Sequence, residues 1–272
     1  MIPIIYLVSI GAGLIVGSFL NVVVLRFNTG WTLQGRSRCL SCSHQLSWLE
    51  LVPVVSFLWQ RGHCRHCGSQ ISSQYITVEL VTALVFGFIA WRAVTDIGLE
   101  WFELVRTVVW TWAVASTLVV IAAYDLKHKI IPDQLVYLFM ALSALSGFVL
   151  NFDFGIAEIV WLVHGLYSGG LLFLAFWALW YFSAGRLMGF GDAKLVFGLG
   201  LWLGLKDALI GVMLAFILGA VVGLGLIALR RSKNLPKGWR LLSLKSEIPF
   251  APFLVTGAFI SFILNLGDVL AG

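Results

Sequence analysis

Residues 159–184 read IVWLVHGLYSGGLLFLAFWALWYFSA, with no Asp, Glu, Lys or Arg among them. A helix needs about 20 mainly apolar residues to cross the hydrocarbon core of a bilayer. Four further uncharged runs reach or approach this length, at residues 4–25, 108–124, 135–150 and 208–229. These runs predict an all-α protein in which most of the chain is spent crossing a membrane.

Composition supports the same interpretation. Of 272 residues, 60% are apolar and only 11% are charged, whereas soluble domains carry about 25% charged residues. The net charge of +5 does not indicate a nucleic-acid partner, because excess Lys and Arg in a membrane protein more often set its topology. The run 4–25 is expected to be a retained helix and not a signal peptide, since Arg26 follows it and no basic residue precedes it.

The pattern predicts eight spans, at 4–25, 76–94, 104–124, 134–152, 157–183, 194–206, 208–229 and 250–270. Strict alternation places the segments between them on two sides. One side, with Lys194 counted in its adjacent loop, holds 15 of the 18 Lys and Arg residues. The positive-inside rule makes that side cytoplasmic and puts both chain ends outside. The sixth span is short, but without it the six basic residues of Arg230–Lys245 would lie outside.

We therefore expect three parts: a first transmembrane helix at 1–25, a cytoplasmic loop at 26–75 and a transmembrane bundle at 76–272. The loop is the only sizeable polar region. A segment of about fifty residues is too small for a strong core and usually needs a staple. No internal repeat is recognised in the sequence.

All four cysteines lie in this loop, as Cys39-Leu-Ser-Cys42 and Cys64-Arg-His-Cys67. Each CxxC turn can direct two sulfurs at one cation, and two turns complete a tetrahedral sulfur site that suits zinc. Disulfides are the alternative, but a cytoplasmic location disfavours them. Four thiolates leave no open position for water, so the zinc is expected to be structural.

Other loop residues bear on this metal site. His44, His63 and His66 could each replace a sulfur, although four thiolates already fill the coordination shell. Gly62 and Gly68 stand beside the second CxxC pair and fit the tight backbone that such a turn requires.

Two aspartates stand at membrane boundaries. Asp125 ends the third span, and Asp192 opens the sixth within Gly189-Phe190-Gly191-Asp192-Ala193-Lys194. Taken singly, Asp125 can be explained as a juxtamembrane charge and Asp192 as a helix N-cap. Asp133 is a third candidate, expected to cap the fourth span because it follows Pro132.

Together the two aspartates suggest a site for acid–base catalysis. Carboxylates brought to one site cannot both ionise easily and therefore share a proton. The ionised one can take a proton from water while the protonated one polarises a peptide carbonyl. Asp125 and Asp192 are thus the candidate catalytic pair of an aspartic peptidase, with Gly189 and Gly191 letting an extended substrate approach the backbone.

The chain resembles the bacterial prepilin peptidases, the leader peptidases and N-methyltransferases of type IV pilus and type II secretion systems. The resemblance covers almost the whole length and rests on these motifs: Gly17-Ser-Phe-Leu-Asn21 with Arg26, Arg36-Ser-Arg-Cys39 with both CxxC pairs, Tyr75-Ile-Thr-Val-Glu79-Leu, Asp125 with Ile131-Pro132-Asp133, Gly189–Asp192 with Lys194, and Pro249-Phe-Ala-Pro252-Phe-Leu.

Three motifs depart from the family pattern without loss of a carboxylate or thiolate. The family's CPxC reads Cys39-Leu-Ser-Cys42 here, GMGD reads Gly189-Phe-Gly-Asp192, and PFGP reads Pro249-Phe-Ala-Pro252.

The resemblance implies a bacterial inner-membrane enzyme whose active site faces the cytoplasm. Its substrate would be a prepilin or pseudopilin with a basic leader ahead of a hydrophobic helix, cut after a glycine. The new N-terminus would then be methylated from S-adenosylmethionine. No strand–GxGxxG–helix unit marks a methyl-donor site, so the cytoplasmic loop and membrane-edge residues such as Glu79 are the candidates. Lys194 is a further supporting residue.

Membrane lipid is the other expected partner, with Arg230–Lys245 a topology signal or a contact for lipid headgroups. No nucleic-acid partner is expected, and the sequence does not predict the oligomeric state.

Two other functions are compatible with parts of the sequence. An intramembrane GxGD protease of the presenilin or signal-peptide-peptidase type also pairs Tyr-Asp with GxGD, as Tyr124-Asp125 and Gly189–Asp192 do. Those enzymes lack the paired CxxC loop, which also disfavours an archaeal preflagellin peptidase. A transporter with a zinc-stapled loop is the alternative from another class, but transporters usually place ionisable residues near the bilayer midplane.

Overall fold

The structure is a computed structural model that describes residues 2–29, 32, 35–97, 100–151, 156–230 and 249–265. Over these residues the secondary structure is helical, with two isolated bridges and no strand. Six helices are long and apolar enough to cross a membrane. The expected all-α polytopic architecture is confirmed, with a helix count close to the predicted one.

Contacts divide the chain into two compact units, Met1–Ala123 and Tyr124–Gly272. The division falls inside one helix, α4 (Trp101–His128). This is a different partition from the three parts expected from the sequence, which remain a prediction. Each unit is described by itself below.

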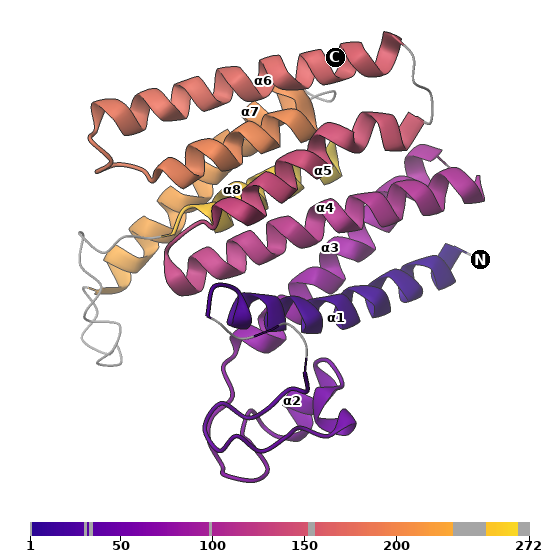
Figure 1. Cartoon of the computed structure of the whole chain (residues 1–272), viewed down its shortest axis with the longest axis vertical. Coiled ribbons are helices and arrows are strands. Elements are labelled where there is room, and N and C mark those ends of the chain that lie inside the picture. Colours follow the sequence, from indigo (N-terminus) through magenta and orange to yellow (C-terminus); the bar gives the residue numbers. More distant parts are fainter. Residues whose placement is uncertain are drawn as a thin grey trace. The chain divides into compact units, whose positions relative to one another are not determined.

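The first unit contains α1 (Ile2–Arg26), α3 (Gln74–Ile97) and most of α4. Helices α1 and α3 pack side by side along their length (Figure 1). Two glycines of α1 allow the close approach. A Cβ on Gly13 would lie 2.6 Å from Cα of Ala83, and one on Gly17 would lie 2.8 Å from Cα of Glu79. Small residues let helix backbones approach closely in lipid.

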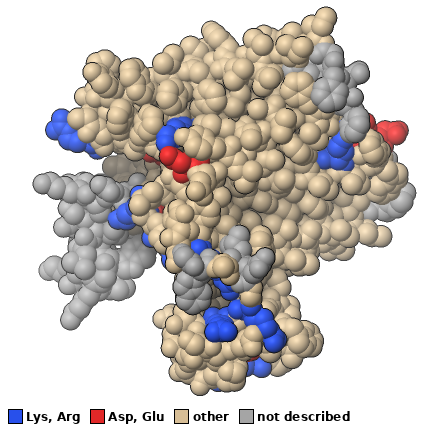
Figure 2. All heavy atoms as spheres, in the orientation of Figure 1, with Lys and Arg blue, Asp and Glu red and all other residues tan. Residues whose placement is uncertain are grey.

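The polar loop leaves the ends of α1 and α3 and contains two short helices, η1 (Trp48–Leu51) and α2 (Val55–Trp59). Its surface is basic, with exposed side chains at Arg36, Arg38, Arg61 and Arg65. Figure 2 shows basic side chains gathered over the loop, whereas most of the visible helical surface is uncharged. The contrast fits helices that face lipid and a loop that faces water.

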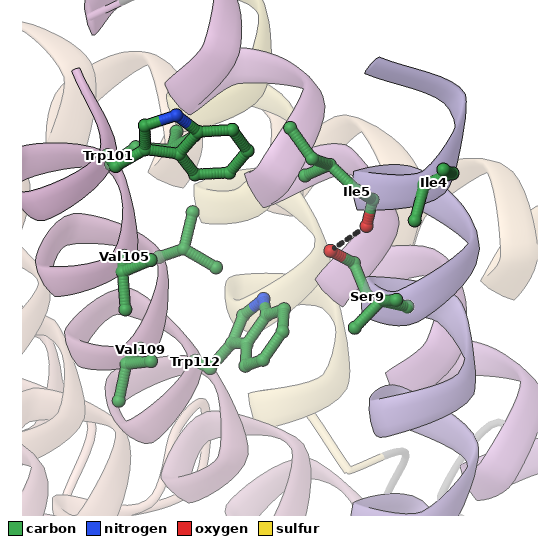
Figure 3. Close-up of a pocket in the computed structure, with 10 residues that line it drawn as sticks. Ile4, Ile5, Ser9, Trp101, Val105, Val109 and Trp112 are labelled. Carbon is green, nitrogen blue, oxygen red and sulfur yellow. Dashed lines mark hydrogen bonds between the residues drawn. The ribbon is translucent and has the colours of Figure 1, made fainter. Parts of the chain in front are cut away.

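An apolar cavity of about 370 Å³ lies between α1 and the first half of α4. Figure 3 shows Ile4, Ile5 and Ser9 facing Trp101 and Trp112 across it. The Ser9 hydroxyl, its only side-chain hydroxyl, donates to the Ile5 carbonyl oxygen at 2.7 Å. No titratable side chain lines this cavity, so it supplies no group for acid or base catalysis.

The second unit is built on α7 (Phe190–Arg230), which packs against α5 (Asp133–Asn151), α6 (Ile156–Phe182) and α8 (Ala251–Leu264). Glycines again sit at the contacts. A Cβ on Gly200 would lie 2.6 Å from Cα of Gly169 in α6, and one on Gly211 would lie 3.0 Å from Cα of Ala258 in α8. By contrast, Gly170 and Gly225 have open space around them.

Helix α7 corrects the predicted boundaries. The spans expected at 194–206 and 208–229 are two helical segments joined within α7 at a kink, where the φ of 73° and ψ of 178° of Gly204 are not helical. Only glycine adopts this conformation readily. The helix starts at Phe190, so its first part has a length of about 21 Å at 1.5 Å per residue. Of the basic stretch Arg230–Lys245, residues 231–245 lie outside the described residues.

Candidate active site and metal centre

Both candidate aspartates lie at helix ends within the second unit. Asp125 is in the last turn of α4, which ends where Lys129 adopts a left-handed φ of 56° and donates its N–H to the Asp125 carbonyl at 2.7 Å. Asp192 is in the first turn of α7. Their exposed fractions are only 5% and 7%, so two carboxyl groups are withdrawn from water at this site.

The Asp125 carboxyl is oriented by a third helix end. Its Oδ2 accepts a hydrogen bond from the backbone N–H of Ala251 at 3.2 Å. Ala251 is the first residue of α8, and the N-terminus of a helix carries a partial positive charge that favours an anion. Sequence analysis did not identify this donor. Pro252, near the helix start, was the available signal, because proline is common there.

The Asp192 carboxyl binds back to its own helix start. Its Oδ2 accepts from the N–H of Gly189 at 3.2 Å, and the Asp192 N–H donates to the Gly189 carbonyl at 3.2 Å. Asp192 is therefore the third helical residue, in the position of the acidic partner of a capping box, and not the N-cap. Its other oxygen, Oδ1, is buried and has no hydrogen-bond partner among the described residues. A buried oxygen left unpaired is costly, so Oδ1 is available for a ligand.

The two carboxyl groups are also close enough to interact. A negative charge on Asp125 would disfavour a second negative charge on Asp192. The end of α4 therefore supplies Asp125, and the start of α7 supplies Asp192. The start of α8 supplies the backbone donor, Ala251.

The flanking residues hold the start of α7 in place. A Cβ on Gly191 would lie 2.9 Å from Cβ of Ile131, so this glycine permits contact with the segment before α5. Lys194 pairs with Asp133 at 2.6 Å and lies 4.9 Å from the ring centroid of Phe190. Asp133 is the first residue of α5, with the Pro132 carbonyl accepting from the following turn. The expected N-cap role of Asp133 is therefore wrong by one residue.

Glu79 lies in the first unit and accepts a hydrogen bond from the loop. It is 6% exposed, and its Oε2 accepts the N–H of Val54 at 2.8 Å. Val54 has a φ of 62° and a ψ of −51°, and the Val55 N–H donates to the Pro53 carbonyl at 2.6 Å. This is a classic γ-turn, a rare and strained conformation for a β-branched residue. The buried carboxylate of α3 thus holds a strained turn of the loop.

The four cysteines converge on one point in the loop. All are free, and their sulfurs lie within 4.8 Å of one another. The sulfurs of Cys39 and Cys67 are 3.8 Å apart, whereas a disulfide requires about 2.0 Å. Tetrahedral zinc with Zn–S bonds of 2.3 Å would separate its sulfurs by about 3.8 Å. The cluster therefore fits a structural metal and not a pair of disulfides.

The two CxxC turns repeat each other at an offset of 25 residues, a repeat that sequence analysis missed. The N–H groups of Cys39 and Cys64 donate to the carbonyls of His44 and Ser69 at 2.9 and 2.8 Å. Isolated bridges join Arg38 to Gln45 and His63 to Gln70. A left-handed residue closes each turn, Ser43 at φ 58° and Gly68 at φ 68°. Gly68 therefore has the tight backbone predicted for it. At the matching position of the first turn, Ser43 adopts the same left-handed conformation.

Hydrogen bonds lower the pKa of two of the four cysteines, Cys39 and Cys67. The N–H groups of Cys42 and Ser41 lower the pKa of Cys39 to about 6. The hydroxyl of Ser69 lies 3.1 Å from the sulfur of Cys67 and holds the pKa of that thiol below its usual range. Because metals bind the thiolate, these contacts favour metal binding at neutral pH.

Fold and site together define a polytopic membrane protein with a buried aspartate pair and a four-cysteine loop. Residues 12–93 match the bacterial peptidase A24 N-terminal domain, and residues 112–224 match the type IV leader peptidase family.

Curated relatives agree. A prepilin leader peptidase/N-methyltransferase of Aeromonas hydrophila is 31% identical over 92% of this chain and 87% of its own length. The protein of the same name in Pseudomonas aeruginosa is 30% identical over 94% and 89%, and that of Myxococcus xanthus is 37% identical over 78% and 60%. No solved structure matches. The chain belongs to the type IV leader peptidase family.

Proposed function

We propose that this chain is an aspartic endopeptidase that removes the leader from type IV prepilins or type II secretion pseudopilins and then methylates the new N-terminus. The names of its relatives support both activities. The observation that carries the peptidase assignment is the buried pair formed by Asp125 and Asp192, in which Oδ1 of Asp192 has no hydrogen-bond partner among the described residues.

In the proposed reaction the two carboxyl groups share one proton. The ionised carboxylate takes a proton from a water molecule, whose oxygen attacks the scissile carbonyl carbon, while the protonated carboxyl donates to the carbonyl oxygen. Collapse of the tetrahedral intermediate breaks the C–N bond and passes a proton to the amine. The products are the leader with a new carboxylate and the mature protein with a free amino group.

The experiment compares Asp125→Asn and Asp192→Asn with Asp96→Asn in purified full-chain protein. Either active-site variant is expected to lower the cleavage rate of a prepilin by at least about 10²–10⁴-fold, the usual contribution of a general acid or base. Asp96 is an exposed partner of Arg92 in the first unit, so its variant should cleave normally. Near-normal cleavage by either active-site variant, with unchanged thermal unfolding, would refute the assigned pair.

Gly189, Gly191 and Lys194 are proposed to support this pair. The N–H of Gly189 binds Asp192, Gly191 allows the start of α7 to approach Ile131, and Lys194 ties that start to Asp133. None of the three carries the reaction itself.

We place the site at the cytoplasmic face of the inner membrane. The side predicted to carry it holds 15 of the 18 Lys and Arg residues, as expected for a cytoplasmic side. Protease added to intact spheroplasts should leave the loop 35–75 uncut until the membrane is permeabilised. Cutting before permeabilisation would reverse the orientation.

We propose that Cys39, Cys42, Cys64 and Cys67 hold one structural zinc ion, supported by the 3.8 Å sulfur separation described above. The ion would cross-link the two CxxC turns of a loop too small for a strong core. Metal analysis of the purified protein should find zinc, and Cys64→Ser should hold one zinc ion fewer than wild type. A zinc-free, disulfide-bonded loop would overturn this assignment.

The second reaction needs S-adenosylmethionine, which supplies the methyl group. The loop and Glu79 are proposed to support it, because Glu79 is a buried carboxylate that contacts the loop at Val54. Glu79→Gln should reduce methylation of the mature N-terminus, measured by mass spectrometry, more than it reduces cleavage. Equal loss of both reactions would show that Glu79 only holds the Val54 turn.

A further inference from the structure

Beside the four cysteines, the loop brings together two histidines and one carboxylate. His44 follows the first CxxC pair, His66 stands inside the second, and Glu50 belongs to η1 between them. One ligand atom from each lies within 4.8 Å of the others. The ring centroids of His44 and His66 are 3.4 Å apart. Three segments of the loop therefore direct metal-binding groups to one place.

Glu50 shows why this cluster is more than a chance contact at a surface. The residue is 9% exposed. Its Oε2 accepts from the N–H and the hydroxyl of Ser47, each at 2.8 Å, while its Oε1 is buried without a hydrogen-bond partner among the described residues. Carboxylates that bind metals are themselves hydrogen-bonded in this way. A buried oxygen without a partner is costly, and a metal ion would remove that cost.

We propose that His44, Glu50 and His66 form a second zinc site in the loop, separate from the four cysteines. Two imidazole nitrogens and one carboxylate oxygen are a known zinc ligand set, with a fourth position left for water. The same set also binds iron(II), but zinc binds divalent sites of this kind more tightly than iron. The four cysteines already complete their own tetrahedron, so the histidines are not needed there.

The geometry requires only a small adjustment. With Zn–N bonds of 2.0–2.1 Å, tetrahedral ligand atoms lie about 3.3 Å apart. The exposed side chains of His44 and His66 can close the remaining distance by rotation, whereas Glu50 is already fixed by Ser47.

The repeat of the two turns provides a control. At the offset of 25 residues, the counterpart of His66 is Ser41 and that of His44 is Ser69. Each histidine is therefore matched by a serine in the other turn, and because the two serines supply no imidazole, only one site of this kind is expected. Ser41→Ala changes the position that matches His66 without removing a ligand.

The test measures zinc in purified full-chain protein after equilibration with a zinc buffer and removal of free metal. Wild type and Ser41→Ala should each hold two zinc ions per chain. His44→Ala, His66→Ala and Glu50→Gln should each hold one. Cobalt substitution provides a second measurement: the variants should keep the thiolate-to-cobalt absorption of the four-cysteine site and lose the weaker bands of the nitrogen and oxygen site.

The outcomes are distinct. One zinc ion in wild type, or two in all three variants, would overturn the proposal. A fall from one ion to none in the histidine variants would also overturn it, because it would assign the histidines to the cysteine site. Binding of iron(II) but not zinc would contradict the choice of metal.

Discussion

At the scale of single residues, hydrogen-bond donors decide what each acidic group can do. Asp125 and Asp192 each bind one backbone N–H, from Ala251 and Gly189. The sequence placed both aspartates at helix ends, but it could not reveal Ala251 as a partner. That contact joins residues 126 positions apart and depends on tertiary packing, for which no local pattern exists.

The cysteines of the first turn should differ in reactivity for the same reason. In metal-free protein at pH 7, Cys39 should be alkylated before Cys42, although Cys42 is the more exposed. The N–H groups of Cys42 and Ser41 lower the pKa of Cys39 to about 6. Although the N–H of His44 lowers it, desolvation and the neighbouring Cys39 thiolate raise the pKa of Cys42 to about 11 overall.

Alkylation followed by mass spectrometry over time gives the order directly. The absolute rate at Cys39 should fall as the pH falls through 6, because its thiolate is then protonated. The preference over Cys42 should narrow only as the pH rises towards 11, where Cys42 also ionises. Faster reaction at Cys42 at pH 7 would contradict the predicted order.

At the scale of elements, glycine positions control how closely the helices of the second unit pack. The sequence shows many glycines in the later helices, and Gly169 and Gly200 lie at a close contact between α6 and α7. It could not tell which glycines matter. Gly170 is next to Gly169 but has open space, and only the rotation of α6 about its axis distinguishes the two.

A pair of alanine substitutions tests this distinction. Gly200→Ala should destabilise the protein by about 1–3 kcal/mol, because the new methyl group would meet the backbone of Gly169 and overpack the contact. Gly170→Ala should be neutral or stabilising by up to about 1 kcal/mol, since alanine favours a helix over glycine. Thermal or denaturant unfolding in detergent measures both, and equal effects would mean that the α6–α7 contact is not tight at Gly200.

At the scale of the whole molecule, two compact units carry different tasks. The cysteine cluster and Glu79 belong to Met1–Ala123, and the aspartate pair belongs to Tyr124–Gly272. Apolar runs predicted the membrane helices well, since length and hydrophobicity are local properties. The division inside α4 was not predictable, because it depends on which helices pack together and α4 itself is continuous across it.

Metal removal should therefore affect the units unequally. After zinc is removed by a chelator, limited proteolysis should cut within residues 35–75, because the loop loses its cross-link. Helices α5 to α8 should remain protected. Mass spectrometry of the fragments locates the cuts, and early cleavage between those helices would indicate that the second unit also depends on the metal.

The hydrogen bond from Ala251 to Asp125 has a consequence for the order in which the protein matures. The ribosome makes α4 first, then α7, and α8 only after a further segment of chain. Both aspartates are therefore in the membrane before the donor that orients one of them has been synthesised. A nascent chain should therefore remain without peptidase activity until α8 has been synthesised and inserted, because its Ala251 supplies the donor to Asp125.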